Sequence, residues 1–134
     1  MLKKEKLMKK FKIMLVEDEE ILLDMFELLI TGEFDCEVTT AVNGSEAMEI
    51  LKMNSSFDLI ISDYKMPKAT GGDLFQFNST RHNFPFFLYS GGDLTEYSEF
   101  TNFQKTNPAN RFFNKPFNEK VLIAEIKRLY DLKS

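Results

Sequence analysis

Residues 57–67 read FDLIISDYKMP and give the clearest indication of the architecture. Residues 57–62 carry the strongest strand signal in the chain, because a short apolar run is typical of a strand buried on both faces of a parallel sheet. Asp63 follows this run at once. We therefore expect a buried strand that ends beside an aspartate.

Similar apolar runs recur on both sides of this stretch, with amphipathic segments between them. The runs predict five strands, at residues 11–16, 37–42, 57–62, 84–89 and 111–114. The intervening segments predict helices, the third of them only a brief one near 73–77, and the fourth ended early by Asn107 and Pro108. Such alternation predicts an α/β fold: a doubly wound, five-stranded parallel sheet with helices on both faces and a functional site at the carboxyl ends of the strands.

The first and last helices are expected to be amphipathic. In the first, an apolar side opposes Asp24 and Glu27, Gly32 is a natural stop, and the apolar side consists of Ile21, Leu22, Met25, Phe26, Leu28 and Leu29. In the closing helix, 121–132, the side chains expected to point inward are Leu122, Ile123, Ile126 and Leu129. The strand at 37–42 is the least apolar and is expected at the sheet edge.

Length and composition indicate one domain. The chain has 134 residues, of which 43% are hydrophobic and 28% charged, so one core can be filled and a second module is excluded. Cys36 is the single cysteine, which rules out an intramolecular disulfide and favours a reducing, cytoplasmic location. The apolar run at 11–16 stops at four acidic residues, so it is too short for a signal peptide or a membrane span.

Charge is distributed unevenly along the chain. Residues 1–12 hold six lysines and one glutamate, a net charge of +5, whereas the rest carries 11 bases and 20 acids, a net charge of −9. We therefore divide the chain into a basic arm, 1–10, and a domain, 11–134. The acidic domain is unsuited to tracking phosphates along a nucleic acid, so no nucleic-acid partner is expected through it.

Charged and polar side chains stand at the ends of four predicted strands: Glu17, Asp18, Asp63, Ser90 and Lys115. They converge in one cleft if the first strand is central, as in the common doubly wound order. Three carboxylates at close range need a compensating cation, and hard oxygen ligands suit Mg²⁺ or Mn²⁺. With that cation and Lys115 cancelling charge, Asp63 is a candidate nucleophile toward a phosphoryl group, whose oxygens the Ser90 hydroxyl and Lys115 could bind.

Four segments together resemble the receiver domain of two-component response regulators. They lie at residues 13–19 (IMLVEDE), 58–67 (DLIISDYKMP, with Gly71 beyond), 88–91 (LYSG) and 113–117 (FNKPF). Each alone is a weak motif, but four in order, each at a strand end, are specific. The resemblance covers nearly the whole chain from Phe11 to Leu132, and it implies the flavodoxin-like receiver fold with strand order 2-1-3-4-5.

The resemblance also implies roles for individual residues. Asp63 would be the phosphoacceptor, and a histidine kinase or histidine phosphotransfer protein would supply the phosphoryl group. The metal ligands would be Asp18, Asp63, Glu17 (often through water) and the backbone carbonyl of Lys65. Ser90 and Lys115 would bind the phosphoryl group, and the bond between Lys115 and Pro116 would be cis. Such a domain catalyses only its own phosphorylation and dephosphorylation, so it is not an enzyme in the usual sense.

Phosphorylation would switch the conformation. Ser90 would be drawn toward the new phosphoryl group, and Phe112 would turn into the space released. Phe112 stands where a tyrosine is frequent, and Gly91 and Gly92 follow Ser90 where bulkier residues are usual, so this loop is expected to be mobile. The signal would pass to a downstream protein, and the domain would be a monomer or a weak or phosphorylation-dependent dimer.

Other functions fit less well. A phosphatase of the haloacid-dehalogenase type needs a second aspartate where Lys65 stands, and a flavodoxin-like cofactor binder needs a phosphate loop where residues 17–20 are acidic. The remaining alternative is a phosphorylation-independent, receiver-like interaction domain. Phe100 and Phe103 either join the core or form an exposed patch for a partner. The chain is expected to be a single-domain regulator or a piece of a larger one, with no DNA-binding module after the closing helix.

Overall fold

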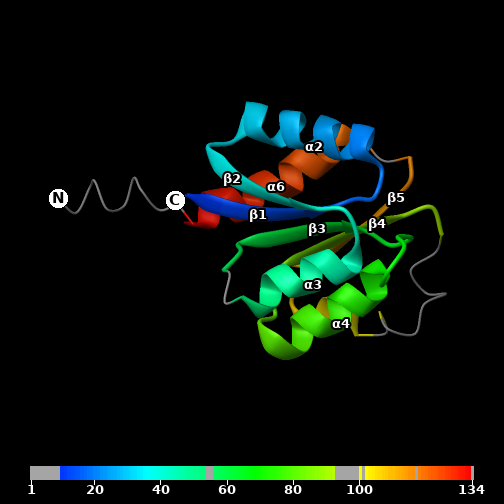
Figure 1. The fold of residues 1–134 in the computed structure, drawn as a ribbon. Coiled ribbons are helices and arrows are strands. Elements are labelled where there is room, and N and C mark those ends of the chain that lie inside the picture. Colours follow the sequence, from blue (N-terminus) through cyan, green and yellow to red (C-terminus); the bar gives the residue numbers. More distant parts are fainter. Residues whose placement is uncertain (1–9, 54–55, 93–99, 101, 117, 134) are drawn as a thin grey trace.

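Five parallel strands form one sheet in the order β2-β1-β3-β4-β5 (Figure 1). The computed structural model describes residues 10–53, 56–92, 100, 102–116 and 118–133. The strands are β1 (Phe11–Val16), β2 (Cys36–Ala41), β3 (Leu59–Asp63), β4 (Phe86–Ser90) and β5 (Arg111–Asn114). The fold class and strand order expected from the sequence are confirmed, with β2 at the edge.

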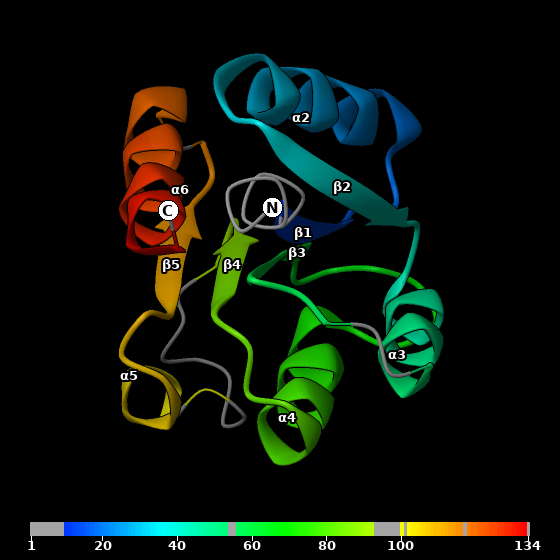
Figure 2. The same cartoon turned by 90° about the vertical axis from the view of Figure 1, so that its left-hand side faces the viewer.

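Helices cover both faces of the sheet, as Figures 1 and 2 show. On one face lie α2 (Glu20–Glu33) and α6 (Glu119–Lys133), and on the other lie α3 (Gly44–Lys52), α4 (Gly71–Arg81) and the short α5 (Phe103–Thr106). Side chains alternate along β1, so Ile13 and Leu15 enter the core under α2 and α6, whereas Met14 and Val16 enter the core under α3, α4 and α5. Among the described helices, none has the length and hydropathy needed to cross a bilayer.

Two of the five strands have the predicted bounds, β1 and β5. Both β3 and β4 begin two residues later than expected and end one residue later. Pro85 precedes β4 and has no N–H to donate to a neighbouring strand. Its carbonyl accepts a hydrogen bond from Ile60 N at 2.9 Å. The later ends make Asp63 and Ser90 the last residues of their strands rather than the first residues of loops.

Helix α2 differs from the expectation in the side that it buries. The residues of α2 that are fully buried are Leu23 and Ile30, seven positions apart, while Ile21, Met25 and Leu28 are 77%, 55% and 73% exposed. The apolar side of this helix is therefore wider than the strip that the sheet and α6 cover. Gly32 was expected as the stop but lies inside the helix, which ends at Glu33 with Phe34 as its C-cap.

Helix α4 is longer than the brief segment expected, with 11 residues. A reciprocal capping box starts it: Thr70 Oγ1 accepts a hydrogen bond from Asp73 N at 3.2 Å, and Asp73 Oδ2 accepts one from Thr70 N at 2.9 Å. Two glycines at the start of the helix obscured it in the sequence, since glycine has low helix propensity.

Phe100 and Phe103 belong to the core, so the alternative of an exposed patch is wrong. They are 4% and 3% exposed, and their rings pack 5.3 and 5.0 Å from the ring of Phe75 on α4. The closing helix buries Leu122, Ile126 and Leu129 as predicted. Most of the basic arm, residues 1–9, and Phe117 of the last motif lie outside the described residues.

Candidate functional site

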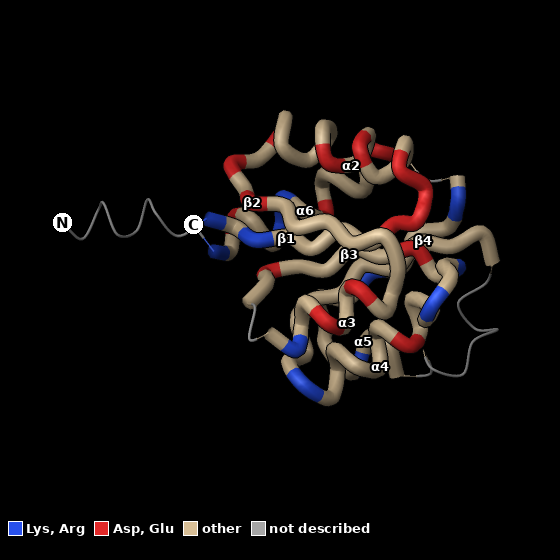
Figure 3. Tube along the Cα trace, in the orientation of Figure 1, with Lys and Arg blue, Asp and Glu red and all other residues tan. Residues whose placement is uncertain are grey.

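Three carboxylates meet where β1 and β3 end. Val16 pairs with Ser62 in the parallel register, so Glu17, which follows β1, and Asp63, the last residue of β3, lie side by side. One carboxylate oxygen from each of Glu17, Asp18 and Asp63 lies within 4.8 Å of the others. Figure 3 shows acidic positions along α2 and at the end of the sheet where this helix begins. The convergence expected from the sequence therefore occurs in the fold.

Asp63 is buried, at 5% exposure, and has one cationic neighbour. Its Oδ1 accepts a hydrogen bond from Tyr64 N at 2.8 Å and lies 3.2 Å from Lys115 Nζ. Burial raises the pKa of the Asp63 carboxyl, and the nearby Lys115 ammonium and the Tyr64 hydrogen bond offset this rise only in part. The charged form of Asp63 therefore lowers the free energy of unfolding.

Glu17 is more deeply buried, at 1% exposure, and both of its oxygens are engaged. Oε1 accepts a hydrogen bond from the Tyr89 hydroxyl at 2.6 Å, and Oε2 accepts one from Glu19 N at 3.0 Å. Burial raises the pKa of Glu17, the two hydrogen bonds lower it, and the Asp63 carboxylate raises it again. Asp18 is exposed and points its carboxylate to the same cluster from the solvent side.

The donor set fits a small, hard cation. Three carboxylates at this spacing supply the oxygen ligands that Mg²⁺ prefers and leave room for water or phosphoryl oxygens. A shallow cavity of about 350 Å³ lies next to the carboxylates, lined by Asp18, Lys65, Met66, Pro67 and Thr70. Lys65, whose carbonyl is the expected fourth ligand, therefore borders the same space as Asp18.

Lys115 and Ser90 are joined through the backbone. Lys115 N donates a hydrogen bond to Ser90 O at 2.8 Å, and the peptide bond from Lys115 to Pro116 is cis, as the resemblance implies. Ser90 is 4% exposed, and its Oγ accepts a hydrogen bond from Gly92 N at 3.1 Å. Because β4 Tyr89 pairs with Asp63, Ser90 lies one residue beyond the phosphoacceptor candidate on the neighbouring strand.

Phe112, the expected switch residue, lies on β5 and is half-buried. It pairs with Leu88 in the register of β4 and β5, and its ring packs against the core on the side of α3, α4 and α5. Phe112 lies two positions before Asn114, which pairs with Ser90. The structure thus places Phe112 and Ser90 on adjacent strands.

Tyr89 is a site residue that the sequence analysis missed. It was counted only as a strand residue, yet it is 2% exposed, its hydroxyl donates to Glu17, and Lys115 Nζ lies 5.2 Å from its ring centroid. Burial and the neighbouring carboxylates raise the pKa of the Tyr89 hydroxyl, which therefore stays protonated and donates. The available signal was a tyrosine in a fully apolar strand, since a buried hydroxyl needs a partner.

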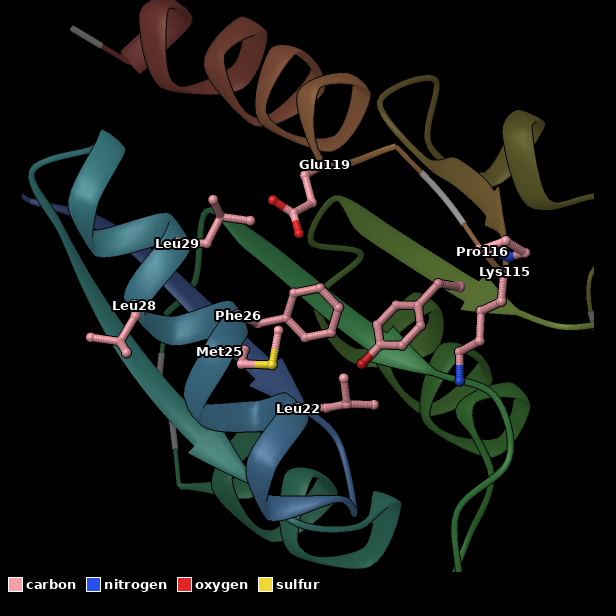
Figure 4. A pocket seen from close by; sticks show the side chains of 9 residues that line it. Leu22, Met25, Phe26, Leu28, Leu29, Lys115, Pro116 and Glu119 are labelled. Atoms are coloured by element: carbon pink, nitrogen blue, oxygen red, sulfur yellow. The ribbon is translucent and has the colours of Figure 1, made fainter.

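An apolar groove opens between α2 and the loop after β5, beside Tyr89 and Lys115 (Figure 4). It has a volume of about 780 Å³ and is lined by Leu22, Met25, Phe26, Leu28, Leu29, Tyr89, Lys115, Pro116 and Glu119. Figure 4 shows the α2 side chains on one side and Lys115, Pro116 and Glu119 across from them. The sequence did not predict this groove, because its position depends on which side of α2 faces away from the core.

The family of the chain follows from this fold and site. The family model described as "Response regulator receiver domain" matches residues 13–127, so the chain belongs to the receiver-domain family of two-component response regulators, a family of signalling domains.

Individual relatives agree with this assignment. The chain is 32% identical over 116 residues to the regulatory protein VanR from Enterococcus faecium, an alignment that covers 87% of this chain and 48% of VanR. The chain thus spans about half the length of the curated relatives that it matches.

Solved receiver structures have the same fold. A response regulator receiver domain protein from Clostridium thermocellum superposes with a TM-score of 0.73 at 25% identity, over 92% of this chain and 96% of that one. A CheY-like receiver domain protein from Methanospirillum hungatei superposes with a TM-score of 0.76 at 24% identity, over 93% of this chain and 97% of that one.

Proposed function

We propose that the domain accepts a phosphoryl group on Asp63 with the help of Mg²⁺, or Mn²⁺ in its place. One observation carries the proposal: the buried Asp63 carboxylate lies 3.2 Å from the Lys115 ammonium and within 4.8 Å of two further carboxylates. The metal ligands that we assign are Glu17, Asp18, Asp63 and the carbonyl of Lys65. Bound there, the cation would neutralise the oxygens of the incoming phosphoryl group.

The proposed reaction transfers a phosphoryl group from a histidine nitrogen of the donor to an oxygen of Asp63. Because Tyr64 N and Lys115 Nζ both engage Oδ1 of Asp63, we assign Oδ2 as the attacking oxygen. The new O–P bond forms as the N–P bond of a phosphohistidine breaks, and the electron pair of that bond stays on the imidazole nitrogen. In autodephosphorylation, a water oxygen would attack phosphorus as the Asp63 O–P bond breaks. The electron pair of that bond returns to the Asp63 carboxylate, and the water proton passes to the released phosphate or to solvent.

Lys115 and Ser90 would turn this chemistry into a conformational signal. The phosphoryl group adds roughly one negative charge and three acceptor oxygens, which the Lys115 ammonium and the Ser90 hydroxyl would bind. Since Ser90 O already accepts a hydrogen bond from Lys115 N, a shift of either residue moves the other. Phe112 on the adjacent strand would then turn inward toward the space that Ser90 leaves.

The phosphodonor that we propose is a protein, either a histidine kinase or a histidine phosphotransfer protein. The apolar groove supports this partner because it borders Lys115 and is far larger than a small phosphodonor needs. The output passes to a downstream protein and not to nucleic acid. We assign this function to residues 11–134, with 1–10 as a basic arm, and propose a cytoplasmic location because Cys36 is the only cysteine.

Intact mass spectrometry tests the proposal. The chain is incubated with acetyl phosphate or phosphoramidate, with Mg²⁺ and with EDTA, and we expect a gain of one phosphoryl group that requires the metal. Asp63→Asn should abolish this gain, whereas Asp35→Asn, an exposed aspartate whose side chain is 76% accessible, should retain it.

Either of two results would contradict the proposal. Acid-labile phosphate retained on Asp63→Asn would move the acceptor to another residue. No gain under any condition would favour a phosphorylation-independent interaction domain.

A further inference from the structure

We propose that Tyr89 is a positioning residue of the cation site: its hydroxyl fixes the carboxylate of Glu17, and its ring supports the ammonium of Lys115. The inference rests on the proposed function, because it assigns a role toward the cation that this function uses. Tyr89 itself touches neither the cation nor the phosphoryl group.

The hydroxyl and the carboxylate form a buried pair. Tyr89 and Glu17 are 2% and 1% exposed, and the 2.6 Å hydrogen bond between them joins residues 72 positions apart in the sequence. Glu19 N holds the second oxygen at 3.0 Å. Two donors on opposite oxygens leave the carboxylate one orientation, and the remaining lone pair of each oxygen stays available to a ligand.

Glutamate needs this support more than aspartate would. Its side chain has one more rotatable bond, and fixing that bond when a cation binds costs conformational entropy. The hydrogen bond from the Tyr89 hydroxyl already fixes the Glu17 side chain in the folded protein, so this entropy is not lost again when the cation binds. Ligands held by such outer hydrogen bonds bind metal more tightly, and removal of the outer partner typically lowers metal affinity by roughly 10- to 100-fold.

The ring of Tyr89 acts on the second charged group. Lys115 Nζ lies 5.2 Å from the ring centroid, within the range of a cation–π interaction. On its other flank the ring packs against Phe26 of α2, with 5.4 Å between the centroids. The ring is thus fixed between α2 and the loop after β5, and one side chain orients both Glu17 and Lys115.

Titration with Mg²⁺ alone tests the hydroxyl. Tyr89→Phe removes one oxygen and keeps the ring, so we expect a folded protein whose Mg²⁺ affinity is about tenfold weaker by calorimetry. In the acetyl phosphate reaction, the Mg²⁺ concentration at half-saturation should rise while the rate at saturating Mg²⁺ changes little. Tyr130→Phe is the matched control, because Tyr130 packs against Phe11 at the opposite end of β1 and should leave both values unchanged.

A double-mutant cycle separates positioning from a general packing effect. Glu17→Asp shortens the side chain by one methylene and takes the carboxylate out of reach of the Tyr89 hydroxyl. In that background Tyr89→Phe should cause no further loss of Mg²⁺ affinity. An equal loss in both backgrounds, or an affinity unchanged by Tyr89→Phe alone, would overturn the proposal.

The unsubstituted chain provides a second readout if Tyr89→Phe does not fold. The four tyrosines are labelled with ¹³C at Cζ, and three of the signals are assigned with Tyr64→Phe, Tyr97→Phe and Tyr130→Phe. Mg²⁺ should shift the fourth signal, that of Tyr89. Mg²⁺ saturation that leaves the Tyr89 signal in place, or no Mg²⁺ binding at all, would also contradict the role. Mg²⁺ binding without phosphoryl gain would refute the proposed function instead, and the Tyr89 comparison would still be decisive.

Discussion

A buried carboxylate defines the chemistry of this domain at the scale of single residues. Asp63 combines 5% exposure with a neighbouring ammonium and two neighbouring carboxylates. Burial disfavours its charge more than Lys115 favours it, so the pKa of Asp63 lies above the usual value of 3.8. The charge that the proposed function requires on Asp63 therefore destabilises the fold in the absence of a cation.

Asp63→Asn should stabilise the metal-free protein. Because the pKa of Asp63 is higher in the folded state, the folded state binds the proton more tightly, and stability falls as pH rises from near 3.8 through the folded-state pKa. At pH 8 in EDTA we expect a gain of about 1 kcal/mol from the substitution, a few degrees in Tm. Urea unfolding at several pH values measures it.

The gain should shrink as the pH falls below 3.8, where Asp63 becomes protonated in both states. A gain of the same size at about pH 3 and pH 8 would show that the Asp63 charge is not the cause. Asp35→Asn, which removes an exposed charge, serves as the control.

At this scale the sequence predicted five of the six side chains that form the site. Asp63, Ser90 and Lys115 each follow or end an apolar run, and a residue at a strand end can be recognised without tertiary information. Tyr89 was missed: its hydroxyl in an apolar strand indicates that it needs a partner, but that partner, Glu17, is 72 positions away in the sequence.

At the scale of elements, the joint between β3 and α4 is the tightest feature near the site. Gly71 N donates a hydrogen bond to Tyr64 O at 2.8 Å, and a Cβ on Gly71 would lie 2.9 Å from Tyr64 Cα and collide with the carbonyl oxygen of Asp63. Backbone atoms cannot move aside as a flexible side chain can. The close approach of α4 to the end of β3 therefore requires glycine.

Gly71→Ala and Gly32→Ala should have opposite effects. Gly71→Ala forces β3 and α4 apart, and we expect a loss of about 1–3 kcal/mol in the free energy of unfolding. Gly32 is exposed in α2 with no heavy atom within 4 Å of an added Cβ, so Gly32→Ala should gain about 0.5–1 kcal/mol through helix propensity. Chemical denaturation of both variants beside the unsubstituted chain gives the two values, and a stabilising Gly71→Ala would refute this account of the joint.

The helices also show the limit of periodicity as a guide. Apolar spacing located α2 correctly but not its buried residues, since the covered strip depends on where α6 and the sheet lie. The start of α4 was missed because its two glycines reduce propensity, whereas the capping box of Thr70 and Asp73 and the close packing against β3 stabilise the helix there.

At the scale of the whole molecule, strand order brings the charges together. The order β2-β1-β3-β4-β5 places β1, β3, β4 and β5 side by side, and all four end at the same edge. Glu17, Asp18 and Asp63 come from two of these strands and Lys115 from the last. A cation that binds the three carboxylates would link two separate segments of the chain, beside the Lys115 ammonium, and stabilise the fold as a unit.

Mg²⁺ should therefore raise the stability of the entire domain. A ligand that binds only the folded state at a hundred times its Kd contributes about 2.7 kcal/mol, and we expect urea unfolding with and without the metal to show a gain of this size. Asp63→Ala should lose most of the gain, whereas Asp35→Asn should keep it. An equal effect of Mg²⁺ on both variants would indicate nonspecific screening of the acidic surface.

By itself the sequence determined the strands, the parallel sheet and the residues at its carboxyl edge, because apolar runs and the residues that end them are local properties of the chain. Only the tertiary structure decided how Tyr89 reaches Glu17, which side of α2 stays exposed and where the groove lies. These features join segments far apart in the sequence, and the physical reason is that burial and hydrogen bonding between such segments are set by how the crossovers pack the helices against the sheet.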